Sequence, residues 1–143
     1  MITVKDILSE KGAKVWTISP DAKVLDALKM MAEKGVGALI VFDQDDVVGV
    51  ISERDYARKV ILKGRHSQDT QVRDIMTSPV YGVHMDTHAE ECMALMTDKH
   101  IRHLPVCKDG DLVGVISIGD VVKARIEEIE REAEEMRAYI STA

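Results

Sequence analysis

The segment VVGVISERD (residues 47–55) recurs as LVGVISIGD (residues 112–120), 65 positions further along a chain of 143 residues. The same register continues upstream without a gap and places Asp21 on Asp86. Outside this register, VKDIL near the N-terminus matches VRDIM with a slip of three residues. A self-match of this length indicates that the chain contains a duplicated structural unit.

Each copy predicts the same order of elements, β-α-β-β-α. In the first copy a strand over residues 15–18 leads to a helix that Asp21 is expected to cap, followed by the strand GALIVF, the polar turn DQDD and the strand VVGVIS. The second copy repeats this order from a strand over residues 80–84, with Asp86 in the capping position. A unit of about 60 residues buries little surface alone. We therefore expect an α/β fold of tandem βαββα repeats, packed as a pseudo-two-fold pair.

The composition is that of a globular protein that does not bind nucleic acid. The formal net charge is −6, and the aromatic residues are one Trp, one Phe and three Tyr. Nucleic-acid binding is disfavoured, because it calls for basic patches and, on single strands, for aromatic stacking platforms. No apolar run approaches the roughly 20 residues that span a bilayer, and MITVKDILSEKGAKV at the N-terminus lacks a signal-peptide core. We expect a cytoplasmic protein without a membrane partner.

Metal and catalytic sites have little support. Cys92 and Cys107 lie within apolar patterns, so we expect free, buried thiols, with a disulfide or metal site as the alternative. His84 and His88 are four residues apart, but a predicted strand-to-helix boundary separates them, so they do not share a helix face. The spacings of zinc sites, CxxC and HExxH, are missing. The chain also shows no GxSxG, Walker A or Gly-rich dinucleotide motif, so we expect neither a metal site nor an enzyme.

A Ser-x-x-Asp motif ends the last strand of each copy, as Ser52 to Asp55 and as Ser117 to Asp120. Taken alone, this motif is typical of a capping box, which is worth about 0.5–2 kcal/mol of helix stability. Its recurrence after an apolar strand favours a further role, because a helix start offers N–H groups and a positive dipole end to a phosphate. An Asp there can accept hydrogen bonds from a ribose diol, and Gly119 lets a ligand approach the backbone closely.

At this point the sequence resembles a known family. The segments SERDYARKVILKG, VRDIMT, MTDKHIRHLPV and LVGVISIGDVV resemble the cystathionine-β-synthase (CBS) domain. As a whole, residues 1–125 resemble a stand-alone CBS pair of the kind found in bacteria and plant organelles. The resemblance implies two βαββα units that meet through their sheets and bind AMP, ADP, ATP, NAD(H) or S-adenosylmethionine in two clefts. Among these adenosine-containing ligands we expect AMP, and no cofactor is required.

The resemblance also implies roles for individual residues. The aspartates of the two motifs would hold ribose hydroxyls, and the serines would contact ribose or phosphate. Apolar strand residues would sandwich the adenine, backbone groups at the next strand would read its edge, and residues ahead of the second repeat would line the second site. The residues that would sandwich the adenine are Ile18, Val83, Ile51 and Ile116. The backbone groups that would read its edge belong to Gly37, Ala38, Arg102, His103, Leu104 and Pro105, and the residues that would line the second site are Met76, Thr77 and Tyr81.

The two implied sites differ in their cations. Arg102 and His103 stand where the first copy has Gly-Ala, and Arg54 stands where the second copy has Gly. Arg suits bidentate phosphate contacts, while a solvated surface role is the alternative for Arg102. We therefore expect two sites of unequal affinity.

The segment DVVKARIEEIEREAEEMRAYI (residues 120–140) predicts a long helix. Its apolar residues recur at intervals of 4, 3, 4, 3 and 4, which forms a heptad-like seam: Val122, Ile126, Ile129, Ala133, Met136 and Ile140. The seam either packs on its own domain or contributes to a homodimer, and we expect the homodimer, in line with the resemblance. We place CBS repeat 1 at residues 1–64, repeat 2 at residues 65–125 and a dimerising helix extension at residues 126–143.

The function expected from these features is a non-catalytic regulatory module. It would bind an adenine nucleotide in the clefts between the two repeats and act as an energy or redox sensor for an unknown protein effector. The alternative is an adaptor that regulates a partner such as a redox protein, with nucleotide binding incidental. The resemblance leaves room for this alternative, since plant relatives are associated with thioredoxin regulation.

Overall fold

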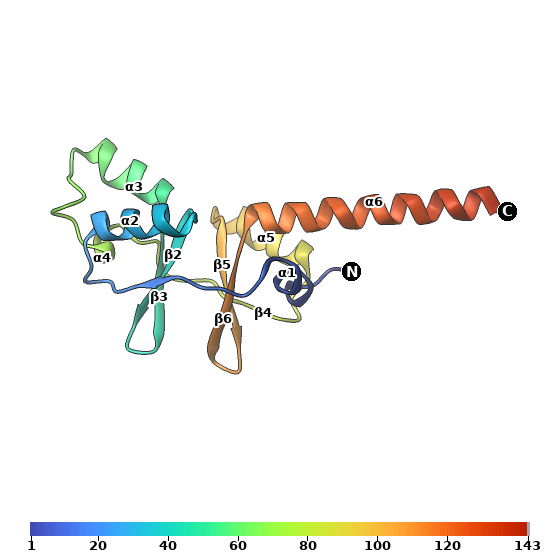
Figure 1. Ribbon diagram of the computed structural model, residues 1–143, viewed down its shortest axis with the longest axis horizontal. Helices are drawn as coiled ribbons and strands as arrows, with labels where there is room; N and C mark the ends of the chain where they lie inside the picture. The colour runs from blue at the N-terminus through green and yellow to red at the C-terminus, as the bar shows by residue number, and fades with distance from the viewer. Residues whose placement is uncertain (143) are drawn as a thin grey trace. The chain divides into compact units, whose positions relative to one another are not determined.

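The computed structural model describes residues 1–142, which form two compact units. Unit 1 combines Met1–Ala13 with the chain from Gly82 onward, and unit 2 is Lys14–Tyr81. Figure 1 shows the two sets of elements along the chain. The compact units are therefore not contiguous copies of the sequence repeat, because the N-terminal segment belongs to the unit that holds the second sheet. The repeat boundaries at residues 64 and 125 stay a prediction.

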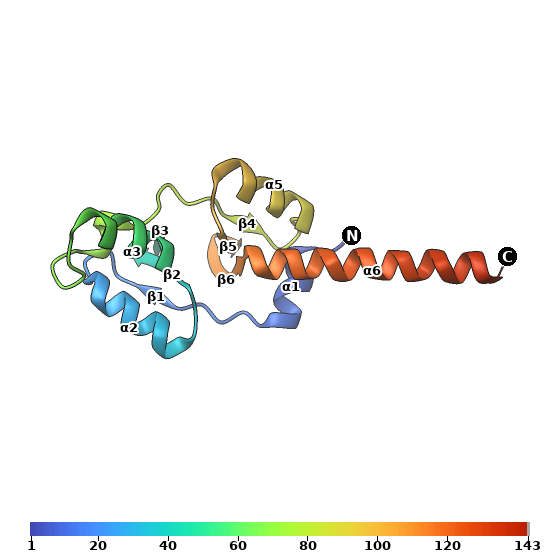
Figure 2. The same cartoon turned by 90° about the horizontal axis from the view of Figure 1, so that it is seen from above.

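Each unit contains one three-stranded sheet and its helices. Unit 2 consists of β1 (Thr17–Ile18), α2 (Val24–Lys34), β2 (Ala38–Asp43), β3 (Asp46–Ser52), α3 (Glu53–Lys59), the 3-10 helix η1 (Ile61–Lys63) and α4 (Val72–Ile75). Unit 1 consists of α1 (Val4–Lys11), β4 (Val83–His84), α5 (Ala89–Lys99), β5 (His103–Lys108), β6 (Asp111–Ser117) and α6 (Ile118–Thr142). Figure 2 shows the same elements from above.

The two sheets share one topology and one register. Their strand orders are β1-β2-β3 and β4-β5-β6, and in each the first pair is parallel and the second antiparallel. Ala38 pairs with Ser52 in β2 and β3, and His103 pairs with Ser117 in β5 and β6, so the register repeats with the shift of 65 residues. Both hairpins carry an irregularity at the same relative position. The predicted α/β class with tandem βαββα repeats and a long C-terminal helix is confirmed.

The matching segments VKDIL and VRDIM begin two short helices that the predicted order did not include. Helix α1 packs on the sheet of unit 1, and α4 packs on the sheet of unit 2. A Cβ atom added at Gly114 would lie 2.8 Å from Leu8 Cδ1, and one added at Gly49 would lie 2.6 Å from the Met76 sulfur. The glycine in each apolar strand therefore makes room for the short helix or the residue that ends it.

The predicted capping role of Asp21 and Asp86 is wrong. Helices α2 and α5 begin three residues later, after Lys23 and His88. The first amide of α2 donates to the carbonyl of Thr70 (2.8 Å), and the first amide of α5 donates to that of Ile2 (2.9 Å). These helix starts are thus satisfied by backbone from another segment, a tertiary contact that local sequence does not reveal.

The hairpin turns and the cysteines agree with expectation, with one difference. Gln44 and Asp45, at the tip of the first hairpin, have positive φ angles, as do the matching residues of the second. Both cysteines are free thiols. Cys92 is buried, and burial raises the pKa of its thiol to about 11, whereas Cys107 is half-buried rather than buried.

Helix α6 is only partly covered by its own unit. Val121, Ala124 and Glu128 are buried on its inner face, whereas Ile126 and Ile129 are 51% and 50% exposed. Figures 1 and 2 both show its C-terminal part extending past α1 and α5. The predicted seam is therefore largely uncovered within unit 1. None of the helices in the described part of the chain is long and apolar enough to cross a membrane.

Candidate functional site

The Ser-x-x-Asp motif forms a capping box in both units. In unit 2, Ser52 Oγ accepts from the amide of Asp55 (3.2 Å), and Asp55 Oδ2 accepts from the amide of Ser52 (3.0 Å). In unit 1, Ser117 Oγ accepts from the amide of Asp120 (3.2 Å), and Asp120 Oδ2 accepts from the amide of Ser117 (2.8 Å). The capping interpretation is confirmed, and it leaves open whether the same carboxylates also bind a ligand.

The carboxylate of Asp55 is surrounded by donors from its own unit. Its Oδ2 also accepts from the hydroxyl of Ser52 (3.0 Å). Its Oδ1 accepts from the hydroxyl of Thr77 (3.1 Å) and pairs with the amine of Lys59 (3.1 Å), one turn along α3. The Asp55 residue is only 8% exposed. Both oxygens of Asp55 therefore have two donors each.

The carboxylate of Asp120 is held differently. Its Oδ2 accepts from the amine of Lys11 (2.6 Å), which also donates to the carbonyl of Val115 (3.0 Å). Burial by itself raises the pKa of Asp120, and the hydrogen bonds from Lys11 and Ser117 outweigh it, so the pKa lies below its ordinary value. The cation comes from α1 rather than from the helix that carries the aspartate. The two motifs thus make the same capping hydrogen bonds, but the lysine that pairs with the aspartate comes from a different helix in each.

The starts of strands β2 and β5 lie beside the motifs, as expected for residues of one site. Glu53, the first residue of α3, donates its amide to the carbonyl of Gly37 (3.0 Å). Ile118, the first residue of α6, donates in the same way to the carbonyl of Arg102 (2.9 Å). Together with the pairing of Ala38 and His103 described above, this places both strand starts next to the predicted serines.

Most of the apolar residues assigned to the adenine lie in the cores of their units. Ile51, Leu104 and Ile116 are fully buried, and Ile18, Val83 and Pro105 are buried as well. Because side chains alternate along a strand, the neighbours Val50 and Val115 point to the other face, and both are half-buried. The contacts of these residues with an adenine stay a prediction.

The remaining candidates, Met76, Thr77, Tyr81 and Arg54, belong to unit 2. Met76 follows α4 directly and packs over Gly49, and the next residue, Thr77, forms a bridge with Val50. Tyr81 is half-buried at the end of unit 2, and Arg54 is exposed in the first turn of α3. The structure therefore joins Thr77 to the motif of the first repeat, through Asp55, and places Met76 beside Gly49 in the strand before that motif. That these residues line the second site stays a prediction.

Two functional candidates were missed from the sequence, Lys59 and Lys11. The spacing of four residues between Asp55 and Lys59 on a helix was a usable signal for an ion pair. Lys11 and Asp120 are 109 positions apart, and no local pattern connects them. Among residues 1–142, no group of His, Cys, Asp and Glu side chains has the arrangement of a metal site.

Comparisons with known proteins agree with this geometry. The CBS domain model matches residues 4–62 and 72–127. The chain is 42% identical to the mitochondrial CBS domain-containing protein CBSX3 of Arabidopsis thaliana, over 96% of this chain and 71% of that protein. The structure of a protein with CBS domains from Burkholderia ambifaria MC40-6 is 50% identical, with a TM-score of 0.84 over 88% of this chain and 95% of that one.

A more distant solved structure carries ligands. The CBS domain pair of protein MJ0100, in complex with 5′-methylthioadenosine and S-adenosyl-L-methionine, is 23% identical. Its TM-score is 0.78, over 90% of this chain and 98% of that one, and at this identity the likeness shows the fold alone. Taken together, the repeated topology, the family match and these relatives show that the chain belongs to the CBS domain family, as a protein with a pair of CBS domains.

Proposed function

We propose that this protein is a non-catalytic regulatory module that binds an adenine nucleotide at its two Ser-x-x-Asp motifs and reports the energy or redox state of the cell. The observation that carries the proposal is the duplicated strand–turn–helix, with a partly buried aspartate at the same position in both repeats. A carboxylate that is already positioned by a helix cap can receive a ribose diol with little loss of side-chain freedom.

The proposed ligand is AMP, with ADP, ATP, NAD(H) and S-adenosylmethionine as further candidates. All share the adenosine group, whose ribose would bind Asp55 or Asp120. Arg54 and Arg102 would add phosphate contacts, since guanidinium groups suit bidentate phosphate binding. The MJ0100 pair, which has this fold, binds two adenosine-containing compounds, and this supports the ligand class without fixing the ligand for this chain.

Isothermal titration of the full chain with AMP, followed by the other candidates, tests the proposal. The expected result is saturable binding at two sites of unequal affinity. A matched control is Asp86→Ala, which removes an exposed carboxylate of unit 1 outside the motif and should leave binding unchanged. If none of the five ligands binds at millimolar concentration, the proposal is wrong.

A second candidate function is that of an adaptor, favoured by the uncovered apolar seam of α6. Such a seam is typical of a helix that packs against another chain. We propose that a second copy of this chain covers it in a homodimer, and that an effector protein, for example a redox protein, binds the assembly. Nucleotide binding would then be incidental to the adaptor role.

The proposed location is the cytoplasm. The relative from Arabidopsis thaliana is a mitochondrial protein. Imaging of the full chain with a fluorescent fusion in the source cell would decide between a cytoplasmic and an organellar location.

A further inference from the structure

We propose that Lys11 is an internal competitor for the nucleotide at Asp120, and that its displacement by the ribose releases the C-terminal end of α1. This inference rests on the proposed function and adds a way in which an occupied site would be reported. It depends on contacts within unit 1 alone.

The hydrogen bonds of Asp120 define the competition. A carboxylate oxygen has about two acceptor positions, and both positions of Oδ2 are taken, by the amide of Ser117 (2.8 Å) and the amine of Lys11 (2.6 Å). A ribose diol that grips both oxygens must therefore remove one donor from Oδ2. The Ser117 amide belongs to the helix cap and is held by the backbone. The side chain of Lys11 is 33% exposed, so water can solvate its amine after it leaves.

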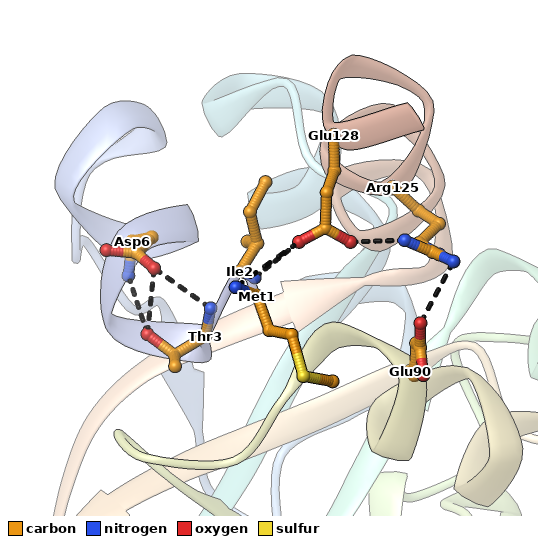
Figure 3. Close-up of polar contacts among 7 residues, drawn as sticks. All are labelled: Met1, Ile2, Thr3, Asp6, Glu90, Arg125 and Glu128. Atoms are coloured by element: carbon orange, nitrogen blue, oxygen red, sulfur yellow. Dashed lines mark hydrogen bonds and ion pairs between the residues drawn. The ribbon is translucent and has the colours of Figure 1, made fainter. Parts of the chain in front are cut away.

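The N-terminal end of α1 is fastened independently of Lys11. Figure 3 shows Glu128 of α6 accepting a hydrogen bond from the amide of Ile2 (2.6 Å), with the terminal amine of Met1 at 3.9 Å. Arg125 pairs with Glu128 and also with Glu90 of α5 (2.9 Å), which fixes the position of the acid. Release of Lys11 would therefore remove the polar contact that holds α1 beyond the buried Leu8, and leave the N-terminal end attached.

The space between α1 and α6 favours that release. A cavity of about 500 Å³ lies beside the two helices. Acidic residues of both helices line it, together with Met1 and Arg131: Asp6, Glu10, Glu127, Glu128, Glu132 and Glu135. The like charges on α1 and α6 repel each other. The ion pair of Lys11 with Asp120 opposes this repulsion, and the repulsion remains when the ion pair is broken.

The end that would be freed is the one that continues into unit 2. Helix α1 ends at Lys11, and the chain passes from unit 1 to unit 2 after Ala13. Binding of a ligand to Asp120 would thus make the end of α1 more mobile, at the point where the chain passes from unit 1 to unit 2. A ligand shifts an equilibrium only through a difference in its interaction with two states, and competition with Lys11 supplies that difference.

Hydrogen–deuterium exchange of the full chain, with and without AMP, tests the inference. AMP should increase deuterium uptake in the last turn of α1, where the amide of Gly12 bonds the carbonyl of Leu8, while α5 serves as the internal reference. Lys11→Met should show this higher uptake without ligand and gain little more on addition of AMP. Asp120→Ala should show it as well. In titrations, Lys11→Met should bind AMP about two- to fivefold more tightly at one site, as expected when a partly exposed ion pair no longer competes.

Lys5→Met is the matched control, because Lys5 is an exposed lysine on the same helix and is not a partner of Asp120. It should change neither the affinity nor the exchange. If AMP binds the wild-type chain but leaves α1 unchanged or more protected, and Lys11→Met does not tighten binding, the competitor role is wrong and the proposed function stands. If no nucleotide binds the wild-type chain, the proposed function fails and this inference fails with it.

Discussion

The hydroxyl of Thr77, the second residue after α4, donates a hydrogen bond to Oδ1 of Asp55 (3.1 Å). The matching aspartate of unit 1 has the amine of Lys11 as its added donor. The aspartate of the unit 2 motif is thus bound by the neutral hydroxyl of Thr77 and by Lys59 of its own helix. The aspartate of the unit 1 motif is bound by a lysine from a separate helix.

Removal of the Thr77 hydroxyl should destabilise unit 2. Thr77→Val keeps the shape of the side chain and leaves Oδ1 of Asp55 with one donor fewer, which should cost about 0.5–1.5 kcal/mol. Chemical denaturation followed by the fluorescence of Trp16, which lies in unit 2, measures the change. Thr17→Val, at an exposed position of β1, is the control and should stay within about 0.5 kcal/mol of wild type.

The two nucleotide sites should respond unequally to loss of their aspartates. Asp120→Ala should weaken AMP binding at the tighter site by about 1.5–3 kcal/mol, the value of a hydrogen bond to a charged group. Asp55→Ala should affect the weaker site, because a ribose there must displace donors from both carboxylate oxygens. Calorimetric titration separates the two. A loss of thermal stability with unchanged affinity would mean that both aspartates are helix caps alone.

Acid should destabilise unit 1. The backbone amide of Thr3 lowers the pKa of Asp6, that of Ile2 lowers the pKa of Glu128, and donors from Lys11 and Ser117 lower that of Asp120 against the effect of burial. Groups with lowered pKa values stabilise the fold above their ordinary values, 3.8 for Asp and 4.5 for Glu, and this contribution is lost as the pH falls further.

Circular dichroism at several pH values measures this effect. The thermal midpoint should be level between about pH 7 and 5 and should fall below about pH 4. Glu128→Gln should lower the midpoint at neutral pH and flatten the fall in acid, since it removes one of the three groups. An identical pH profile for Glu128→Gln would exclude Glu128 as a contributor.

The seam of α6 should control the oligomeric state. The double variant Ile126→Glu and Ile129→Glu places charges at two half-exposed positions of the seam and should convert the proposed homodimer to a monomer of 15.9 kDa. Light scattering after size-exclusion chromatography gives the mass. Glu130→Gln, on the polar side of the same helix, should remain dimeric. A monomeric wild-type chain would refute the dimer.

The sequence predicted the features that repeat or that depend on local pattern. The strands of both sheets were predicted because the same pattern of apolar residues recurs with a shift of 65 residues. Helix α6 followed from its spacing. The caps at Asp21 and Asp86 were predicted wrongly, because the amides of those helices bond to backbone carbonyls far along the chain.

The site was predictable to the same extent. The capping boxes follow from a four-residue motif, and the strand starts beside them follow from the hairpin register. Lys11 was not predictable, because its contact with Asp120 requires α1 to pack on the sheet of the other repeat. The match between VKDIL and VRDIM indicated a repeated segment, but it did not say which sheet each segment joins.

Unit 2 is inserted between two segments of unit 1, since the chain leaves unit 1 after Ala13 and returns at Gly82. Neither sequence repeat can therefore be cut out as a complete folding piece: residues 1–64 lack α4, and a fragment from residue 65 onward lacks α1. Each sequence repeat therefore begins with the short helix that packs on the sheet of the other repeat, so neither half of the chain has its complete set of helices without the other.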